Sequence, residues 1–329
     1  MQYRYLGKSG LQLSVLSLGS WISFSKQINE KTAAQLMAYA YDEGVNFFDN
    51  AEVYAHGESE KMMGKILKKQ KWDRTTYCIS SKVFFGWHGK ENKPNQMGLS
   101  RKHIVEACHE ALQRFQTDYL DLYFCHRPDK NTPIEETVLT MNHLIQQGKI
   151  LYWGTSEWSG VEIMEAHRVA AEYKLIGPIV EQPQYNLFVR EKIENEFSFL
   201  YDTVGLGTTV WSPLASGLLS GKYNNNNKNV GRMHTKGFEW LAERWLQNDK
   251  LKKVEKLAVL AQELGVTLPQ LSIAWCIQNK RVTSAILGAT KKEQLAETFQ
   301  SIELIPKLTQ EVNGAIDKIM KNKPIHSEF

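Results

Sequence analysis

The sequence predicts an α/β fold, a single (β/α)₈ TIM barrel over residues 1–329 with an N-terminal β-hairpin and an additional C-terminal helix. Eight short apolar runs alternate with stretches of helical periodicity, and the connections from each helix to the next strand are short. Strands separated by helices favour a parallel sheet, and eight such units favour its closure. An open doubly wound sheet is the alternative, and the absence of G-x-G-x-x-G after the first strand argues against it.

The individual elements follow in chain order from alternation, periodicity and turn signals. Residues 3–6 and 11–13 alternate around Gly7-Lys8-Ser9-Gly10, which is typical of a β-hairpin, and we expect it to plug the end of the barrel opposite the active mouth. Ser59 is expected to cap the helix that begins at Glu60, since a hydroxyl satisfies free N–H groups there. Strands are predicted at residues 14–19, 45–49, 77–82, 119–124, 150–155, 179–182, 207–211 and 284–287. Helices are predicted at residues 31–42, 60–69, 101–115, 135–147, 161–173, 191–204, 268–279 and 292–300, and a further helical stretch ends at Met320.

Two long segments, residues 84–98 and 221–245, interrupt the alternation. Long segments of this kind inside a compact domain are usually functional or disordered. The asparagine run at residues 224–227 is interpreted as a flexible tip. Phe238, Trp240, Leu241 and Trp245 fit one face of a short helix, which would cover a ligand or form a partner interface.

Composition and charge indicate an ordinary soluble protein. Lys and Arg together number 40 against 36 Asp and Glu, and this small excess gives no argument for nucleic acid or membrane surfaces as partners. No apolar run approaches the roughly 18 residues of a membrane span, and the N-terminus lacks a signal-peptide core. The four cysteines form no C-x-x-C pair and lie in apolar segments. We therefore expect a cytoplasmic protein with reduced core cysteines, no membrane insertion and no metal site.

Polar side chains stand at the predicted ends of neighbouring strands. Asp49 ends the second strand, Lys82 ends the third and His126 follows the fourth, while Tyr54 lies on the loop after Asp49. Active residues of such barrels gather at the C-terminal ends of the strands. Taken singly, Asp49 and Lys82 are also consistent with a cap, an ion pair or a solvated charge, Tyr54 with packing and His126 with a satisfied core histidine. Their convergence on one mouth favours a catalytic site.

These four residues suit general-acid chemistry. A free tyrosine has a pKa near 10, and a nearby ammonium is expected to lower the pKa of Tyr54, with a carboxylate behind the ammonium to hold it in place. Asp49, Lys82 and Tyr54 form such a relay, and His126 would orient or polarise an oxygen next to the phenol. This describes proton donation to a carbonyl that becomes an alcohol.

The sequence resembles the aldo-keto reductases, and within them the branch that contains the β subunits of voltage-gated potassium channels. The resemblance rests on Phe48-Asp49-Asn50-Ala51-Glu52-Val53-Tyr54, Ser80-Ser81-Lys82, Asp121-Leu122-Tyr123-Phe124-Cys125-His126-Arg127-Pro128, Tyr152-Trp153-Gly154-Thr155-Ser156, Trp211-Ser212-Pro213-Leu214-Ala215-Ser216-Gly217 and Leu287-Gly288-Ala289-Thr290. It implies a catalytic tetrad of Asp49, Tyr54, Lys82 and His126, NADPH/NADP⁺ as cofactor and a small aldehyde or ketone as substrate. It also implies a homo-oligomer, with tetramers common in this branch.

The same resemblance implies an alternative function, a redox-sensing, NADPH-binding regulatory subunit of a potassium channel with little turnover. In the channel subunits the position that matches His126 is typically Asn. The histidine in this chain therefore favours the enzyme.

Cofactor contacts are implied residue by residue. The nicotinamide would meet Ser156 and Gln182 and stack on Trp211, and the 2′-phosphate would lie near Thr290 and Gln294. The implied cofactor-binding residues are Ser20, Trp21, Gln27, Asp49, Ser156, Gln182, Trp211, Ser212, Pro213, Leu214, Ala215, Ser216, Lys222, Arg232, Gly288, Thr290, Gln294, Glu297 and Thr298. Two positions depart from the channel subunits: Glu157 replaces Arg, and Thr298 replaces Asn.

Residues in the loops at the barrel mouth support Thr290 as a phosphate contact and predict the substrate pocket. Thr290 before Lys291-Lys292 also resembles a helix N-cap, where N–H groups and lysines suit a phosphate. Aromatic loop residues at the same mouth favour a pocket for small apolar or aromatic carbonyls, although such residues are as often lids or packing. The predicted pocket residues are Trp21, Tyr54, Phe85, Trp87 and His126.

Overall fold

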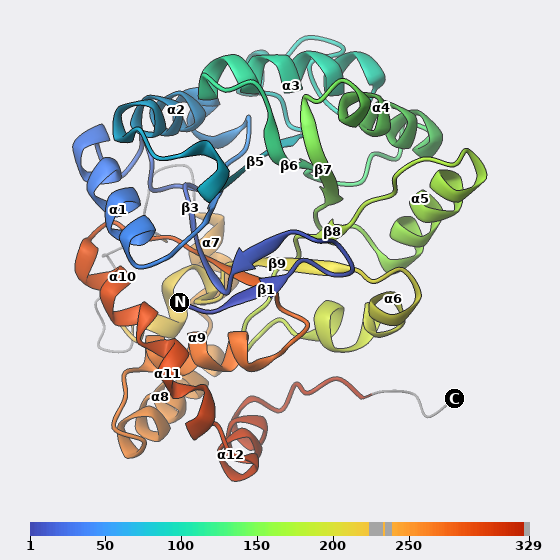
Figure 1. The fold of residues 1–329 in the computed structure, drawn as a ribbon. Coiled ribbons are helices and arrows are strands. Elements are labelled where there is room, and N and C mark those ends of the chain that lie inside the picture. Colours follow the sequence, from blue (N-terminus) through green and yellow to red (C-terminus); the bar gives the residue numbers. More distant parts are fainter. Residues whose placement is uncertain (224–232, 234–238, 326–329) are drawn as a thin grey trace.

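The computed structural model describes residues 1–223, 233 and 239–325, and in this part of the chain eight parallel strands close into a barrel (Figure 1). Their order around the barrel is β10-β3-β4-β5-β6-β7-β8-β9, so the predicted (β/α)₈ fold is confirmed. The strands are β3 Leu16–Gly19, β4 Phe47–Asp49, β5 Cys78–Val83, β6 Leu120–Cys125, β7 Ile150–Thr155, β8 Val180–Glu181, β9 Gly207–Trp211 and β10 Ser284–Leu287.

Helices surround the barrel as an outer layer (Figure 1). They are α1 Glu30–Asp42, α2 Glu58–Gln70, α3 Arg101–Phe115, α4 Ile134–Gln146, α5 Gly160–Glu172, α6 Ser198–Thr203, α7 Trp240–Trp245, α8 Asn248–Glu263, α9 Leu268–Gln278, α10 Lys292–Phe299, α11 Ser301–Leu304 and α12 Gln310–Met320. Short 3₁₀ helices occupy Tyr54–Gly57, Arg74–Thr76, Gly89–Glu91, Ala215–Ser220 and Ile305–Lys307. The predicted C-terminal helix is therefore confirmed as α12.

Three local predictions differ from the structure. The single helix expected at residues 191–204 is a π-helical turn, Lys192–Glu196, followed by α6. Helix α8 was not predicted, because it is largely polar and buries only Val254, Leu257 and Ala261. Ser59 is not the N-cap of α2, because Gly57 takes that position in the left-handed conformation (φ 80°). A β-carbon at Gly57 would also lie 3.1 Å from Cδ of Arg114, so this close turn requires glycine.

The N-terminal hairpin closes the end of the barrel where the strands begin. Strands β1 (Tyr3–Tyr5) and β2 (Gln12–Ser14) pair antiparallel. Leu6 and Leu13 are fully buried in a cluster with Phe47 and Val180, at the starts of β4 and β8. The hairpin therefore fills the bottom of the barrel, as predicted, and leaves the C-terminal ends of the strands for the site.

The four cysteines are free and buried, as expected for core residues. Among residues 1–223, 233 and 239–325, no single helix has the length and apolar character that a membrane crossing requires. The bent pair α8 and α9, which meet at 91°, satisfies the requirement by length and composition only.

Candidate active site

Lys82 connects the carboxylate and the phenol at the top of the barrel. Its ammonium nitrogen lies 2.6 Å from Oδ2 of Asp49 and donates to the hydroxyl of Tyr54 over 3.3 Å. A third bond, of 2.7 Å, goes to the carbonyl of Asn50. The predicted relay of carboxylate, ammonium and phenol is thus present as a connected set of hydrogen bonds.

Strand pairing explains why these groups meet. Strands β4 and β5 are neighbours, and Asp49 pairs in register with Ser80, two residues before Lys82. The second carboxylate oxygen of Asp49 accepts hydrogen bonds from the Ser80 hydroxyl at 2.8 Å and from Nε2 of Gln182 at 3.1 Å. Because both oxygens of this buried carboxylate have donors, Asp49 holds Lys82 in one place.

A strained turn presents Tyr54 to the site. The two residues after it, Ala55 and His56, have left-handed φ angles of 49° and 55°. Residues other than glycine adopt such angles at a cost of about 1–3 kcal/mol each. The turn is fastened by the Tyr54 N–H to the Ala51 carbonyl at 3.0 Å and by Nδ1 of His56 with the Trp87 carbonyl at 3.1 Å. Strain retained at one tyrosine favours a functional reason for its position.

The ionisation of Tyr54 differs from the sequence-based expectation. Burial, together with the negative charge of Asp49, raises the pKa of Tyr54 well above 10, although the Arg127 guanidinium opposes the change. The expected lowering is therefore wrong, because desolvation outweighs the nearby cations. Burial likewise lowers the pKa of Lys82, against the effect of Asp49. The phenol is held in its protonated form, as a general acid needs.

His126 stands beside the phenol on the other side. Its ring is 5.9 Å from the ring of Tyr54 and 5.1 Å from that of Phe85, both edge to face. Burial, with the cations Lys82 and Arg127, lowers the pKa of His126 well below 6.5, so its imidazole is neutral. Within the described residues its buried Nδ1 has no hydrogen-bond partner.

A cavity of about 1130 Å³ runs from this tetrad along the mouth of the barrel, which exceeds the roughly 300–1000 Å³ of ordinary small-ligand pockets. The predicted residues that line it are Trp21, Gln27, Asp49, Tyr54, Phe85, His126, Ser156, Gln182, Trp211, Ser212, Pro213, Leu214, Ser216, Lys222, Gly288, Thr290, Gln294, Glu297 and Thr298. Trp240, which the sequence placed on a short helix over a ligand, also lines it. Lining residues that the sequence did not indicate include Val53, Arg127, Ser220 and Pro269.

Three predicted site residues do not line the cavity, and a fourth lies outside the described residues. Ser20 is buried and donates its hydroxyl to the Asp49 carbonyl at 3.1 Å, and Ala215, the first residue of the 3₁₀ helix after β9, is buried. Trp87 is not among the residues that line the cavity, and its indole N–H bonds Glu110 at 2.6 Å. Arg232 lies outside the described residues, as do residues 224–227 and Phe238.

A bend of left-handed residues after β9, with Lys222 beside it, lines the cavity. After β9 the backbone is left-handed at Ser212, Ala215, Ser216 and Gly217. The N–H groups of the last three bond within the bend, to Ser212 and Leu214, so the groups that can meet an anion are the serine hydroxyls and Lys222. A β-carbon at Gly217 would lie 3.1 Å from Nζ of Lys222, so the ammonium closes over this bend. These residues therefore suit a phosphate-bearing ligand.

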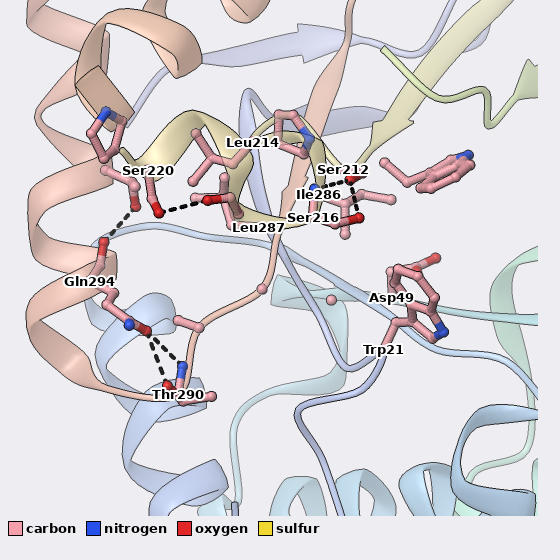
Figure 2. A pocket seen from close by; sticks show the side chains of 18 of the residues that line it. Trp21, Asp49, Ser212, Leu214, Ser216, Ser220, Ile286, Leu287, Thr290 and Gln294 are labelled. Atoms are coloured by element: carbon pink, nitrogen blue, oxygen red, sulfur yellow. Dashed lines mark hydrogen bonds between the residues drawn. The ribbon is translucent and has the colours of Figure 1, made fainter. Parts of the chain in front are cut away.

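The cavity has two distinct ends. In Figure 2, Trp21 and Asp49 lie at one side, and Thr290 with Gln294 lies at the other. Thr290 is not the N-cap of α10, which is Lys291, but its N–H bonds Oε1 of Gln294 at 2.9 Å. A ligand that spans the cavity would therefore reach from the tetrad to the start of α10.

Glu157, where the sequence departs from the expected arginine, has a definite structural role. One of its carboxylate oxygens accepts the indole N–H of Trp211 at 2.9 Å and the N–H of Gln184 at 2.7 Å. The other lies 3.2 Å from the ammonium of Lys192. Trp211 in turn meets Trp21 edge to face at 6.2 Å. Glu157 thus fixes the orientation of an aromatic wall of the cavity.

Comparison with known proteins agrees with this geometry. Residues 15–321 match the model of the aldo/keto reductase family. A probable voltage-gated potassium channel subunit beta from Oryza sativa subsp. japonica is 50% identical over 329 residues, which cover 100% of this chain and 99% of the relative. A protein of the same description from Arabidopsis thaliana is 49% identical over the same shares of the two chains.

Proposed function

This chain belongs to the aldo/keto reductase family, and we propose that it reduces aldehydes or ketones to alcohols with NADPH as the hydride donor. The observation that carries the proposal is the placement of the Lys82 ammonium between Asp49 and Tyr54 at the cavity. Family membership supports an oxidoreductase. The substrate class and the role of Tyr54 as acid are proposals.

The residues present fit the cofactor that this function needs. The cavity is long enough to join the tetrad to α10, and it carries the left-handed bend under Lys222. Trp211 would hold the nicotinamide end, and Ser212, Ser216 and Lys222 the pyrophosphate. When bound, NADPH supplies the hydride that the carbonyl carbon receives.

The chain's own residues then donate the proton and stabilise the charge that it leaves. The O–H bond of Tyr54 breaks as its proton passes to the substrate oxygen, and the resulting phenolate is stabilised by the Lys82 ammonium 3.3 Å away. Asp49 keeps that ammonium charged and in place. The neutral imidazole of His126 would donate a hydrogen bond to the same substrate oxygen, since a neutral ring has one N–H.

A panel of aldehydes and ketones, followed by the loss of NADPH absorbance, tests the proposal directly. We expect turnover of at least one reactive aldehyde such as 4-nitrobenzaldehyde. If no carbonyl in the panel is reduced by a protein that binds NADPH and is folded, the proposed reaction is wrong.

We expect NADPH to bind more tightly than NADH, by about tenfold or more, because Thr290 and Lys291 stand where the doubly charged 2′-phosphate would lie. The ammonium of Lys292 instead lies 4.4 Å from the centre of the Tyr39 ring, so Lys291 is the cation that we expect to matter. Titration by quenching of tryptophan fluorescence measures both affinities. Lys291→Gln should weaken NADPH binding and leave NADH binding unchanged, and equal affinities of the wild type for the two would refute the preference.

Glu157→Ala should raise the Kd for NADPH about five- to tenfold, because the indole of Trp211 loses the acceptor that orients it. Glu165→Ala, on the exposed face of α5, is the matched control. Fluorescence titration of both variants checks the expectation, and native affinity in Glu157→Ala would show that Trp211 needs no such support.

The alternative is a regulatory channel subunit, and the printed descriptions of the two plant relatives favour it. In that case the protein would bind NADPH, associate with a potassium channel and turn over slowly. Co-purification with a resident potassium channel, measured beside steady-state turnover, separates the two functions. We further propose a cytoplasmic location and a homotetramer, which fractionation and light scattering test.

A further inference from the structure

Arg127 is a charged residue of the cavity that the proposed reduction does not use. It follows His126 directly after β6 and lines the cavity with Tyr54 and Phe85. Its guanidinium carbon lies 5.6 Å from the centre of the Phe85 ring, and one N–H bonds the His126 carbonyl. A guanidinium has five N–H donors, so these contacts hold Arg127 in place and leave donors for another acceptor.

Among the described residues, the charge of Arg127 has no acidic neighbour to balance it. Within the described part of the chain, no carboxylate lies within the 4.0 Å of an ion pair with Arg127. Asp49, the acid at this end of the cavity, is paired with Lys82 at 2.6 Å. The remaining charged lining residues, Lys222 and Glu297, belong to the proposed cofactor half. The substrate end is therefore positively charged.

A run of neighbouring side chains leads from the proposed acid to this cation. Tyr54 lies 5.9 Å from His126, His126 lies 5.1 Å from Phe85, and Phe85 lies 5.6 Å from the guanidinium. A substrate oxygen held between Tyr54 and His126 would thus have Phe85 as the next neighbour, with Arg127 beside Phe85. A flat substrate with a polar group at each end matches this sequence of contacts.

We propose that Arg127 makes this site select carbonyl substrates that carry a carboxylate, separated from the carbonyl by about one aromatic ring. The inference rests on the proposed reductase function and names its substrate class. A planar guanidinium matches a carboxylate through two parallel hydrogen bonds, which is a strong and directional form of recognition. The contact with Phe85 and the hydrogen bond to the His126 carbonyl hold the guanidinium at the cavity before the substrate arrives.

A competing role is electrostatic action on the acid itself. Burial and Asp49 raise the pKa of Tyr54 while Arg127 opposes them, so loss of Arg127 would also make the phenol a weaker acid. That effect acts on all substrates alike, whereas recognition acts only on charged ones. The ratio of kcat/KM for a substrate with a carboxylate to kcat/KM for a neutral substrate therefore separates the two roles.

The test compares 4-carboxybenzaldehyde with its neutral methyl ester, methyl 4-formylbenzoate. Wild-type kcat/KM should be higher for the acid, and Arg127→Met should lower the ratio of acid to ester about 10- to 100-fold, mainly through KM. Arg127→Lys, which keeps the charge but loses the fork, should retain part of the preference. Arg168→Met on exposed α5 removes the same charge away from the cavity and should leave the ratio at the wild-type value.

Equal losses of kcat/KM for acid and ester in Arg127→Met would overturn the proposal and support the electrostatic role. A wild-type enzyme that does not prefer the acid would also overturn the proposal. Binding distinguishes this failure from failure of the reductase function. Terephthalate should bind the NADP⁺ complex at least tenfold more tightly than its dimethyl ester by tryptophan fluorescence, whether or not any carbonyl is turned over. Equal binding of the two would refute the proposal independently of catalysis, and thermal unfolding checks that each variant is folded.

Discussion

Tyr54→Phe is expected to lower kcat for aldehyde reduction about 10²- to 10⁴-fold, which is the usual contribution of a positioned general acid. The substitution removes only the hydroxyl, whose hydrogen bond to Lys82 is 3.3 Å long, while Lys82 keeps its bonds to Asp49 and the Asn50 carbonyl. The fold and the affinity for NADPH should therefore remain close to those of the wild type. A loss in kcat without a loss in cofactor binding identifies a group that acts in the transition state.

His126→Asn is the comparison for this variant. The pKa of His126 is held well below 6.5 by burial and by Lys82 and Arg127, so at neutral pH the imidazole carries no extra proton to give. Its replacement should disturb orientation more than proton supply and cost less with small reactive aldehydes. Near-native turnover in a folded Tyr54→Phe protein would mean that the proton comes from elsewhere, and the roles assigned to Tyr54 and His126 would be wrong.

The fold was predictable because its signals are local. Strands β7, β9 and β10 have the predicted bounds, as does α3, since each is an apolar or strongly periodic run between clear turns. Helix α8 was missed because few of its side chains are buried, so its apolar period is weak. The start of α2 was misplaced because the tight turn at Gly57, packed against Arg114, decides it.

The candidate site was predictable where strand topology alone determines it. Asp49, Lys82 and His126 meet because consecutive strand ends of a closed parallel barrel are neighbours. Loop side chains are oriented by partners distant in sequence, and so Trp87, whose indole N–H bonds Glu110, does not line the cavity as the sequence suggested. Arg127 was overlooked for the same reason, because its direction depends on Phe85.

The pKa shifts of the site residues were the property hardest to predict from the sequence. The sequence indicates that an ammonium lies near a phenol, but it does not reveal that both groups are buried away from water. In the structure that desolvation raises the pKa of Tyr54 and lowers that of Lys82. Both shifts disfavour the charged form of the group concerned, so burial, rather than the neighbouring charge, is the larger influence on each.

Lys82→Met should abolish most of kcat, to an extent comparable with Tyr54→Phe, because the phenolate formed on proton transfer loses its cationic neighbour. Unlike Tyr54→Phe, it should also destabilise the protein. The side chains of Lys82 and Asp49 are 0% and 4% exposed, and removal of one partner from a buried ion pair leaves the other charge without compensation. Ser80 and Gln182 still donate to Asp49, so we expect a loss of about 3 kcal/mol in the free energy of unfolding, at the lower end of the usual range.

The double variant Asp49→Asn/Lys82→Met separates the two effects. With the carboxylate neutralised, no uncompensated charge remains, and the amide oxygen of the introduced side chain can still accept from Ser80 and Gln182. Urea unfolding should therefore show recovery of most of the lost stability, while kcat stays as low as in Lys82→Met because the ammonium is still absent. Recovery of kcat together with stability would show that Lys82 serves the fold rather than the phenol. Loss of kcat in a restored fold ties the catalytic effect to the one hydrogen bond between Lys82 and Tyr54.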